Sequence, residues 1–282
     1  MRVDKVLGYA VKGGEVSWTG KDAILYALGV NLGRDPLNRG ELAYLFEKDM
    51  KVLPGFAMVL GHPGFWMREP QFGIDWVKIV HAEQFLETSR PIPSSGTARV
   101  DIRVTGIVDK GADKGAIVYY EKTLSDAATG AEIARVTTGA FCRGDGGCGD
   151  HGVPPSSLAA TPERAPDRSV TREIDLRAAL IYRLSGDFNP LHIDPETARQ
   201  AGYERPILHG LCTMGLANHV LVEEMAGGDP ERFKGFACRF SRPVYPGDKL
   251  RVDIWNEDGG ARWRVVSETS GQVVLDRGRA RV

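Results

Sequence analysis

The chain repeats itself near its midpoint, and this repeat limits the folds that it can adopt. Residues 89–102 carry Ser-Arg-Pro-Ile-Pro and then Arg-Val-Asp-Ile, and residues 241–254 carry Ser-Arg-Pro-Val-Tyr-Pro and then Arg-Val-Asp-Ile, 152 positions later. The other matching blocks are residues 23–29 with 178–186 and residues 52–55 with 207–210, at offsets of 156 and 155. Because three blocks recur in one order at nearly one offset, we expect the two halves to share one fold.

A stretch rich in glycine, proline and serine separates the two halves. It covers residues 144–167 and contains Gly-Asp-Gly-Gly-Cys-Gly-Asp-His-Gly followed by Val-Pro-Pro-Ser-Ser, a composition typical of a linker. We therefore predict an N-terminal domain over residues 1–143, a linker over residues 144–167 and a C-terminal domain over residues 168–282. Both domains have an ordinary size.

The second half has the clearer pattern of helices and strands. We expect a helix after Asp175, with Leu176, Ala179, Leu180 and Leu184 on its buried stripe. Residues 206–225 are apolar on nearly all sides, which indicates a buried helix. The alternating segments 250–254, 262–267 and 272–276 follow and predict an antiparallel meander. An antiparallel sheet around a central helix is the hot-dog fold, so two copies predict an α+β double hot dog.

Charge and composition exclude several partners. The 36 basic and 37 acidic residues leave a formal charge of -1, so we expect no general attraction to nucleic acid or to an anionic membrane. The start lacks the apolar stretch of a signal peptide, no apolar run spans a bilayer, and the end lacks a Ser-Lys-Leu peroxisomal address, so a cytoplasmic location is expected. The four cysteines show no metal-ligand spacing, and we expect no metal.

The densest cluster of reactive side chains lies in Tyr-Arg-Leu-Ser-Gly-Asp-Phe-Asn-Pro-Leu-His-Ile-Asp at residues 182–194. Asp187 and His192 are five positions apart and so cannot share one face of a straight helix, but Gly186 and Pro190 break the helix and allow a loop to aim both at one point. A carboxylate and an imidazole there can hold a water molecule and transfer protons near neutral pH. The alternative is an Asx turn beside a buried histidine.

The first half tests that alternative. Residues 29–38, which correspond to this loop, keep a turn but have no Asp and His at the same spacing. Because the repeated fold does not need the pair, we interpret Asp187 and His192 as functional and predict one active site per chain.

The motif at residues 182–194, with Ala-Gly-Tyr-Glu-Arg-Pro-Ile-Leu-His-Gly-Leu-Cys-Thr-Met-Gly at residues 201–215, resembles the signature of the hydratase 2 family within the MaoC-like dehydratases. The whole chain resembles the two-domain form found as the hydratase unit of the peroxisomal multifunctional enzyme of β-oxidation. Residues 18–29 and His-Ala-Glu-Gln at 81–84 carry the N-terminal part of this resemblance.

The resemblance implies reversible hydration of trans-2-enoyl-CoA to (R)-3-hydroxyacyl-CoA, without a metal or redox cofactor, since CoA is part of the substrate. By motif position, Asp187 and His192 are the catalytic pair, and Asn189 supports the geometry of the loop. The backbone N–H of Gly210 is the implied donor to the thioester oxygen, and a glycine allows close approach there. Which of the pair is acid or base stays open.

Other residues have weaker predicted roles. Arg239, Phe240 and Arg242 offer cations and an aromatic surface for the CoA moiety, but Arg90 occupies the matching place of Arg242 in the first half, so a role in folding is the alternative. His209 is predicted to serve packing or the helix start, in spite of its position before Gly210.

Two other functions stay open. One is a dehydratase that acts on (R)-3-hydroxyacyl groups bound to acyl carrier protein. The other is a non-catalytic acyl-CoA-binding subunit of a hot-dog hetero-oligomer, against which the intact Asp187, Asn189 and His192 argue. The N-terminal domain is expected to be a degenerate hot dog that accommodates the acyl tail, and the chain is expected to form a homodimer.

Overall fold

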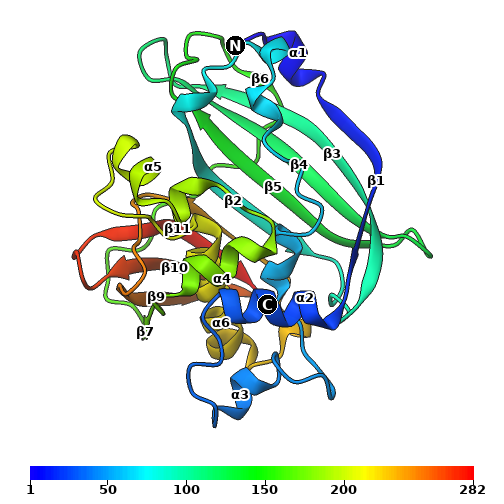
Figure 1. The fold of residues 1–282 in the computed structure, drawn as a ribbon, viewed down its shortest axis with the longest axis vertical. Helices are drawn as coiled ribbons and strands as arrows, with labels where there is room; N and C mark the ends of the chain where they lie inside the picture. Colours follow the sequence, from blue (N-terminus) through cyan, green and yellow to red (C-terminus); the bar gives the residue numbers. More distant parts are fainter.

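The computed structural model describes residues 1–282, and one antiparallel sheet runs through both halves of the chain (Figure 1). The sheet has 11 strands in the order β1-β3-β4-β5-β2-β8-β11-β10-β9-β7, with β6 beside β3. The strands are β1 (Ala10–Trp18), β2 (Ile79–Thr88), β3 (Gly96–Asp109), β4 (Ala116–Asp126), β5 (Glu132–Cys142), β6 (His151–Gly152), β7 (Arg168–Glu173), β8 (Gly235–Phe240), β9 (Lys249–Glu257), β10 (Gly260–Ser267) and β11 (Val273–Arg281).

The strand order has an approximate two-fold symmetry. In each half the first strand lies at the outer edge, followed by the third, fourth and fifth, and the second strand lies at the centre. At the centre, where β2 pairs with β8, Phe85 lies directly opposite Ala237, which is 152 positions later in the chain. This offset is that of the sequence repeat, so a two-fold axis crosses the β2–β8 pair there. The predicted α+β double hot dog is therefore confirmed.

The helices are α1 (Val3–Leu7), α2 (Gly20–Gly29), α3 (Arg39–Leu42), α4 (Ala178–Tyr182), α5 (Pro195–Gln200) and α6 (Gly210–Ala226). The 3-10 helices are η1 (Pro54–Met58), η2 (Trp66–Arg68), η3 (Pro70–Phe72), η4 (Trp76–Lys78), η5 (Arg183–Ser185), η6 (Pro190–His192) and η7 (Pro230–Arg232). None of the helices combines the length and the apolar character needed to cross a bilayer.

The two central helices differ in length. Helix α6 has 17 residues and is buried along most of its length, as its apolar sequence predicts. Its counterpart η1 has only five residues, because Gly61, Pro63 and Gly64 follow and disfavour a longer helix. The Lys122 ammonium caps the end of η1 by donating to the carbonyls of Ala57, Met58 and Leu60. Burial lowers the pKa of Lys122 to about 7, whereas these acceptors favour its charged form.

The predicted start of the buried helix and the predicted stripe of α4 are wrong in part. Residues 206–209 are extended, and α6 begins at Gly210, because the N–H of Leu208 donates to the Val244 carbonyl at 2.7 Å instead. Of the predicted stripe, Leu176, Leu180 and Leu184 are exposed, and α4 buries Ala178, Ala179 and Tyr182.

Close packing against α2 decides which face of α4 is buried. A Cβ on Gly29 would lie 3.0 Å from the Tyr182 Cα, so the two backbones approach where side chains are small. Leucine side chains at this contact would hold the backbones of α2 and α4 farther apart.

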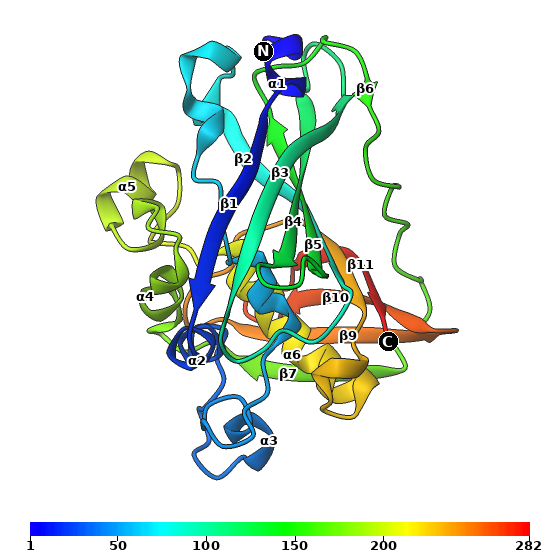
Figure 2. The same cartoon turned by 90° about the vertical axis from the view of Figure 1, so that its right-hand side faces the viewer.

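The segment between the halves has little regular structure. Figure 2 shows that the chain after β6 runs down one side of the molecule in an extended form before it enters β7. Along this path Leu158 is buried, and its carbonyl accepts a hydrogen bond from Arg277 at 3.0 Å. The segment is therefore attached to the sheet even though it forms no strand there.

A buried ion pair lies at the junction of the halves. The carboxylate of Glu83, on β2, is 3% exposed and accepts from Arg239 Nε at 3.0 Å and Nη2 at 2.6 Å, on β8. Its other oxygen accepts from the Tyr119 hydroxyl at 2.8 Å. Because the Glu83 carboxylate is buried away from water, these donors are needed to stabilise its negative charge.

We expect Arg239→Met to lower the free energy of unfolding by about 3 kcal/mol, because the Glu83 carboxylate stays buried without its cation. A matched control is Arg281→Met, which removes the exposed pair between Arg281 on β11 and Glu87 on β2 and is expected to cost less than about 1 kcal/mol. Urea unfolding followed by circular dichroism measures both. Equal, small losses in the two variants would contradict a stabilising role for the buried pair.

Candidate active site

The loop between α4 and α5 holds the predicted catalytic residues. Helix α4 continues into η5 and ends at Gly186, whose φ of 116° a residue with a side chain rarely adopts. The Asn189 side chain then caps η6 by accepting from the Leu191 N–H at 3.0 Å. Asp194 caps α5 by accepting from the N–H groups of Glu196 and Thr197. Local caps therefore fix the course of this loop.

This loop brings Asp187 and His192 together with a third residue, His209. One ligand-type atom from each of the three lies within 4.8 Å of the others. His192 is 9% exposed and His209 1% exposed, while Asp187 is exposed. Two polar atoms up to 4.8 Å apart can both form a hydrogen bond with one water molecule, because each such bond is about 2.8 Å long. Two imidazoles and a carboxylate at this spacing are also the donors that a divalent transition metal takes.

Backbone carbonyls determine the tautomers of the two histidines. His192 Nδ1 lies 2.8 Å from the Ile207 carbonyl, which only accepts, so Nδ1 carries the proton and Nε2 has a free lone pair. In the same way His209 Nε2 donates to the Asp187 carbonyl at 3.2 Å. The two rings stack with their centroids 3.7 Å apart. His209 therefore holds the His192 ring in position.

Both imidazoles are neutral at pH 7. Burial is the main cause that lowers the pKa of His192, against the opposite effects of the Ile207 carbonyl and the Asp187 charge. Burial, with a smaller effect of His192, lowers the pKa of His209 to about 4. His192 Nε2 is thus available to accept a proton at neutral pH.

Gly210 begins α6, so its N–H is one of the donors that a helix leaves without an intrahelical acceptor. The positive end of the helix dipole adds to this donor. A Cβ on Gly210 would lie 3.0 Å from the Phe240 ring, and Phe240 in turn packs on His81 with ring centroids 4.4 Å apart. A glycine is therefore favoured here, since a larger residue would have to displace the Phe240 ring.

In the first half, the backbone donor that corresponds to the Gly210 N–H is already occupied. Pro54 stands where the second half has His209, and the N–H of Gly55 donates to Asn218 Oδ1 at 2.9 Å. Asn218 belongs to α6, so the helix of the second half occupies the donor of the first half. Only one of the two equivalent glycine N–H groups is left for a ligand.

The three residues predicted to bind CoA differ in their exposure and in their contacts. Arg239 is paired with the buried Glu83, and Phe240 packs on Gly210. Arg242 is exposed, and its guanidinium contacts only the Ser241 carbonyl, at 3.4 Å. Of the three, Phe240 lies next to Gly210 and Arg242 has a cation free of ion pairs.

Two residues, His209 and His81, lie closer to the site than the sequence indicated. His209 was expected to serve packing or the helix start, but its ring lies against His192. His81 comes from the first half and reaches the site through Phe240. The position of His209 directly before Gly210 was a usable signal, whereas nothing local in the sequence connects His81 with a loop more than a hundred residues away.

Residues 157–277 match the family described as MaoC like domain, and residues 16–144 match the MFE-2 hydratase 2 N-terminal domain. The chain is 39% identical to the enoyl-CoA hydratase ChsH3 of Mycobacterium tuberculosis, over 97% of this chain and 96% of the relative. It is 38% identical to the 3-hydroxyacyl-thioester dehydratase Y of the same organism, over 93% and 91%.

Among solved structures, the full-length peroxisomal multifunctional enzyme type 2 of Drosophila melanogaster superposes with a TM-score of 0.81 at 35% identity. The match covers 96% of this chain and 48% of that one. Both halves of the present chain are therefore found together, in one order, in a longer relative.

The low pKa of His209 predicts acid-sensitive folding. The unfolded state takes up a proton near pH 6.5 and the folded state only near pH 4, so stability falls as the pH falls through this window. We expect the His209→Gln variant to lose about 2 kcal/mol less than the wild type between pH 7 and pH 5. Urea unfolding at the two pH values measures this difference. Parallel losses in both proteins would contradict the burial of a neutral imidazole.

Proposed function

Because this chain belongs to the MaoC-like dehydratases and has the N-terminal domain of their hydratase 2 form, we propose that it is an (R)-specific enoyl-CoA hydratase. It is a hydro-lyase of this family. The proposed reaction is the reversible syn addition of water to a trans-2-enoyl-CoA. The observation that carries the proposal is the placement of Asp187 and His192 at water-sharing distance, close to the start of α6.

In the proposed mechanism the Gly210 N–H binds the thioester oxygen. As water adds at C3, negative charge builds on this oxygen, and a fixed donor at a helix N-terminus stabilises the enolate-like transition state. Asp187 and His192 Nε2 hold the water. An O–H bond of the water breaks, its oxygen bonds to C3, and Asp187 and His192 carry the released proton to C2 on the same face. Asn189 holds the loop and touches no reacting atom.

The reverse reaction uses the same groups. Loss of water from a 3-hydroxyacyl thioester needs the same proton transfer and the same oxygen contact, by microscopic reversibility. The similarity to a relative named as a 3-hydroxyacyl-thioester dehydratase supports activity in both directions. We propose CoA as the carrier, with an acyl carrier protein as the alternative that a direct comparison of the two thioesters decides.

We expect Asp187→Asn and His192→Gln each to lower kcat for crotonyl-CoA hydration by about 10²- to 10⁴-fold, because each removes one of the two groups that transfer the proton. The measurement is the loss of enoyl-CoA absorbance with the purified single chain. Asp35→Asn, in the corresponding loop of the first half, is the matched control and is expected to keep full activity. Turnover near that of the wild type in either site variant, with an unchanged melting temperature, would end this mechanism.

We propose that residues 1–143 form the domain that accommodates the acyl tail, that residues 144–167 connect the domains, and that residues 168–282 form the catalytic domain. The support is the asymmetry of the central helices, since η1 has five residues where α6 has 17. Because its central helix is short, the strands of the first half are covered by loops and 3-10 turns, which adapt more readily to a bulky ligand than a packed helix does. The homodimer and the cytoplasmic location remain predictions.

This proposal predicts a preference for long acyl groups. We expect kcat/KM to rise from crotonyl-CoA to a hexadecenoyl-CoA, because each buried methylene contributes about 0.8 kcal/mol of binding. A chain-length series with the purified protein measures it. Equal kcat/KM values for short and long thioesters would contradict a tail-binding role of the first half.

A further inference from the structure

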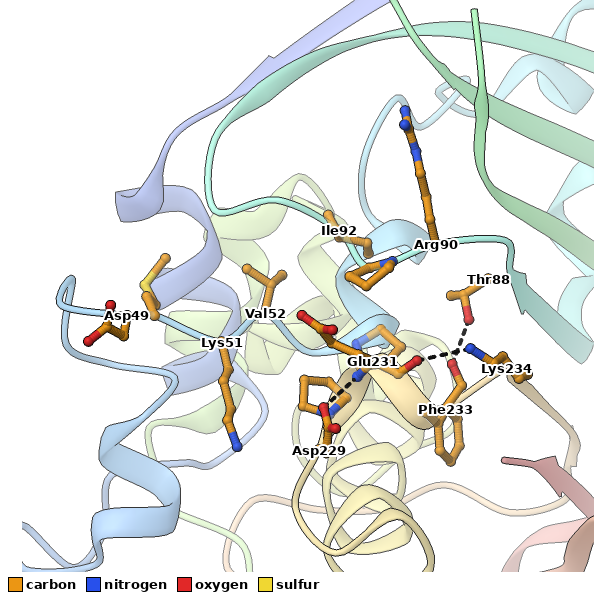
Figure 3. A pocket seen from close by; sticks show the side chains of 14 residues that line it. Asp49, Lys51, Val52, Thr88, Arg90, Ile92, Asp229, Glu231, Phe233 and Lys234 are labelled. Carbon is orange, nitrogen blue, oxygen red and sulfur yellow. Dashed lines mark hydrogen bonds between the residues drawn. The ribbon is translucent and has the colours of Figure 1, made fainter. Parts of the chain in front are cut away.

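A second cavity lies beyond the C-terminal end of α6, at the opposite end of this helix from Gly210. Its volume is about 260 Å³. Figure 3 shows that its walls come from three segments, namely residues 49–54, which lead into η1, residues 88–92, which begin at the end of β2, and residues 229–234 around η7. Neither Asp187 nor His192 lines it.

The two-fold symmetry places this cavity where the second half has its active site. By the offsets of the repeat, the lining residue Pro54 corresponds to His209, Thr88 to Phe240, and Arg90 to Arg242. Phe233 lines the cavity from the second half, just as its counterpart His81 reaches the active site from the first. The cavity is therefore the symmetry-related copy of the active site.

This copy lacks the catalytic groups. The donor that corresponds to Gly210 N–H is bonded to Asn218, and residues 29–38 hold no Asp and His at the catalytic spacing. Chemistry is thus excluded at this place, while the space is kept. Arg90 keeps the place of Arg242, whereas Lys51 and Lys234 correspond to Pro206 and Ala82 and are cations of this cavity alone.

Three cations line the cavity, and two of them, Lys51 and Lys234, have unused donors. Arg90 Nη2 pairs with Asp126 and donates to the Ala131 carbonyl, each at 3.3 Å, and its buried Nε is out of reach of a ligand. The exposed ammonium groups of Lys51 and Lys234 each donate to one backbone carbonyl, of Gly228 at 2.8 Å and of Glu231 at 3.0 Å. Each ammonium has three donors, so two remain on each. These donors suit phosphate oxygens at the mouth of the cavity.

The lining also holds carboxylates. Asp49, Asp229 and Glu231 balance the three cations, so the lining has no net charge. A lining without net charge has no general attraction for anions, so a phosphate-bearing ligand must gain its binding from the two lysines and from the packing of its uncharged part. Apolar residues such as Val52, Ile92 and Phe233 line the inner wall, where such a part packs.

We propose that this cavity is a second, non-catalytic binding site for coenzyme A and its thioesters. The inference rests on the proposed function, because the class of ligand is taken from the symmetry-related active site. A site of this kind lets the concentration of CoA or product act on the enzyme without competing directly for Gly210.

Isothermal titration of the full chain with free CoA tests the proposal. We expect two molecules per chain for the wild type, and one for the double variant Lys51→Glu and Lys234→Glu, whose charges repel phosphate. The weaker site is expected to lose at least tenfold in affinity. Lys110→Glu, an exposed lysine in the β3–β4 turn far from the cavity in sequence, is the matched control and is expected to keep two molecules. Crotonyl-CoA hydration at low substrate is expected to be unchanged in all three proteins.

The outcomes separate this inference from the proposed function. One CoA molecule per chain in the wild type, with hydration intact, overturns the second site and leaves the hydratase proposal standing. Two molecules in both the wild type and the double variant also overturn the assignment to this cavity. Two molecules that fall to one in the double variant support the second site, even where hydration itself is not found. A double variant that changes only KM for long-chain thioesters assigns the cavity to the acyl tail and overturns the inference.

Discussion

The pairing of β2 with β8 is the contact on which the rest of the structure depends. It joins two five-stranded halves into one sheet and lies on the two-fold axis, where Phe85 faces Ala237. The Glu83–Arg239 pair crosses it, so a buried charge is neutralised only when the strands are in this register. The same strands end at Phe240 and Thr88, beside the active site and the second cavity. One register therefore positions both sites.

Symmetry at the axis coexists with asymmetry at the helices. Each half has a glycine in the first turn of its central helix, but the Gly55 N–H of η1 donates to Asn218 of α6, whereas the Gly210 N–H at the start of α6 is free. The long α6 thus has two effects. Its own Gly210 N–H is available to a ligand, and its Asn218 side chain accepts the hydrogen bond of the Gly55 N–H. The short η1, capped by Lys122, is the counterpart of this arrangement in the first half. The loss of one site and the shape of the other follow from one helix.

Local sequence predicted the course of the loop that holds Asp187 and His192 well, because this course is fixed by local hydrogen bonds. Gly186 has a positive φ, and Asn189 and Asp194 cap the helices that follow them, all within a few residues. The helix stripe failed for the opposite reason. Leu176, Leu180 and Leu184 form a plausible apolar face, yet the close approach of Gly29 to Tyr182 buries the face with small side chains. Which face of a short helix is buried depends on its neighbour.

The sequence by itself determined the repeat, the double hot dog, the position of Asp187 and His192, and the lack of that pair in the first half. These follow from periodicity, turn residues and an internal offset, all of which act over short distances along the chain or by comparison of its halves. Only the tertiary structure decided that His209 stacks on His192, that Arg239 is bound to Glu83, and that Asn218 fills the donor of Gly55. Each joins residues that are distant or differently oriented in sequence, and such contacts exist only after the sheet has closed around α6.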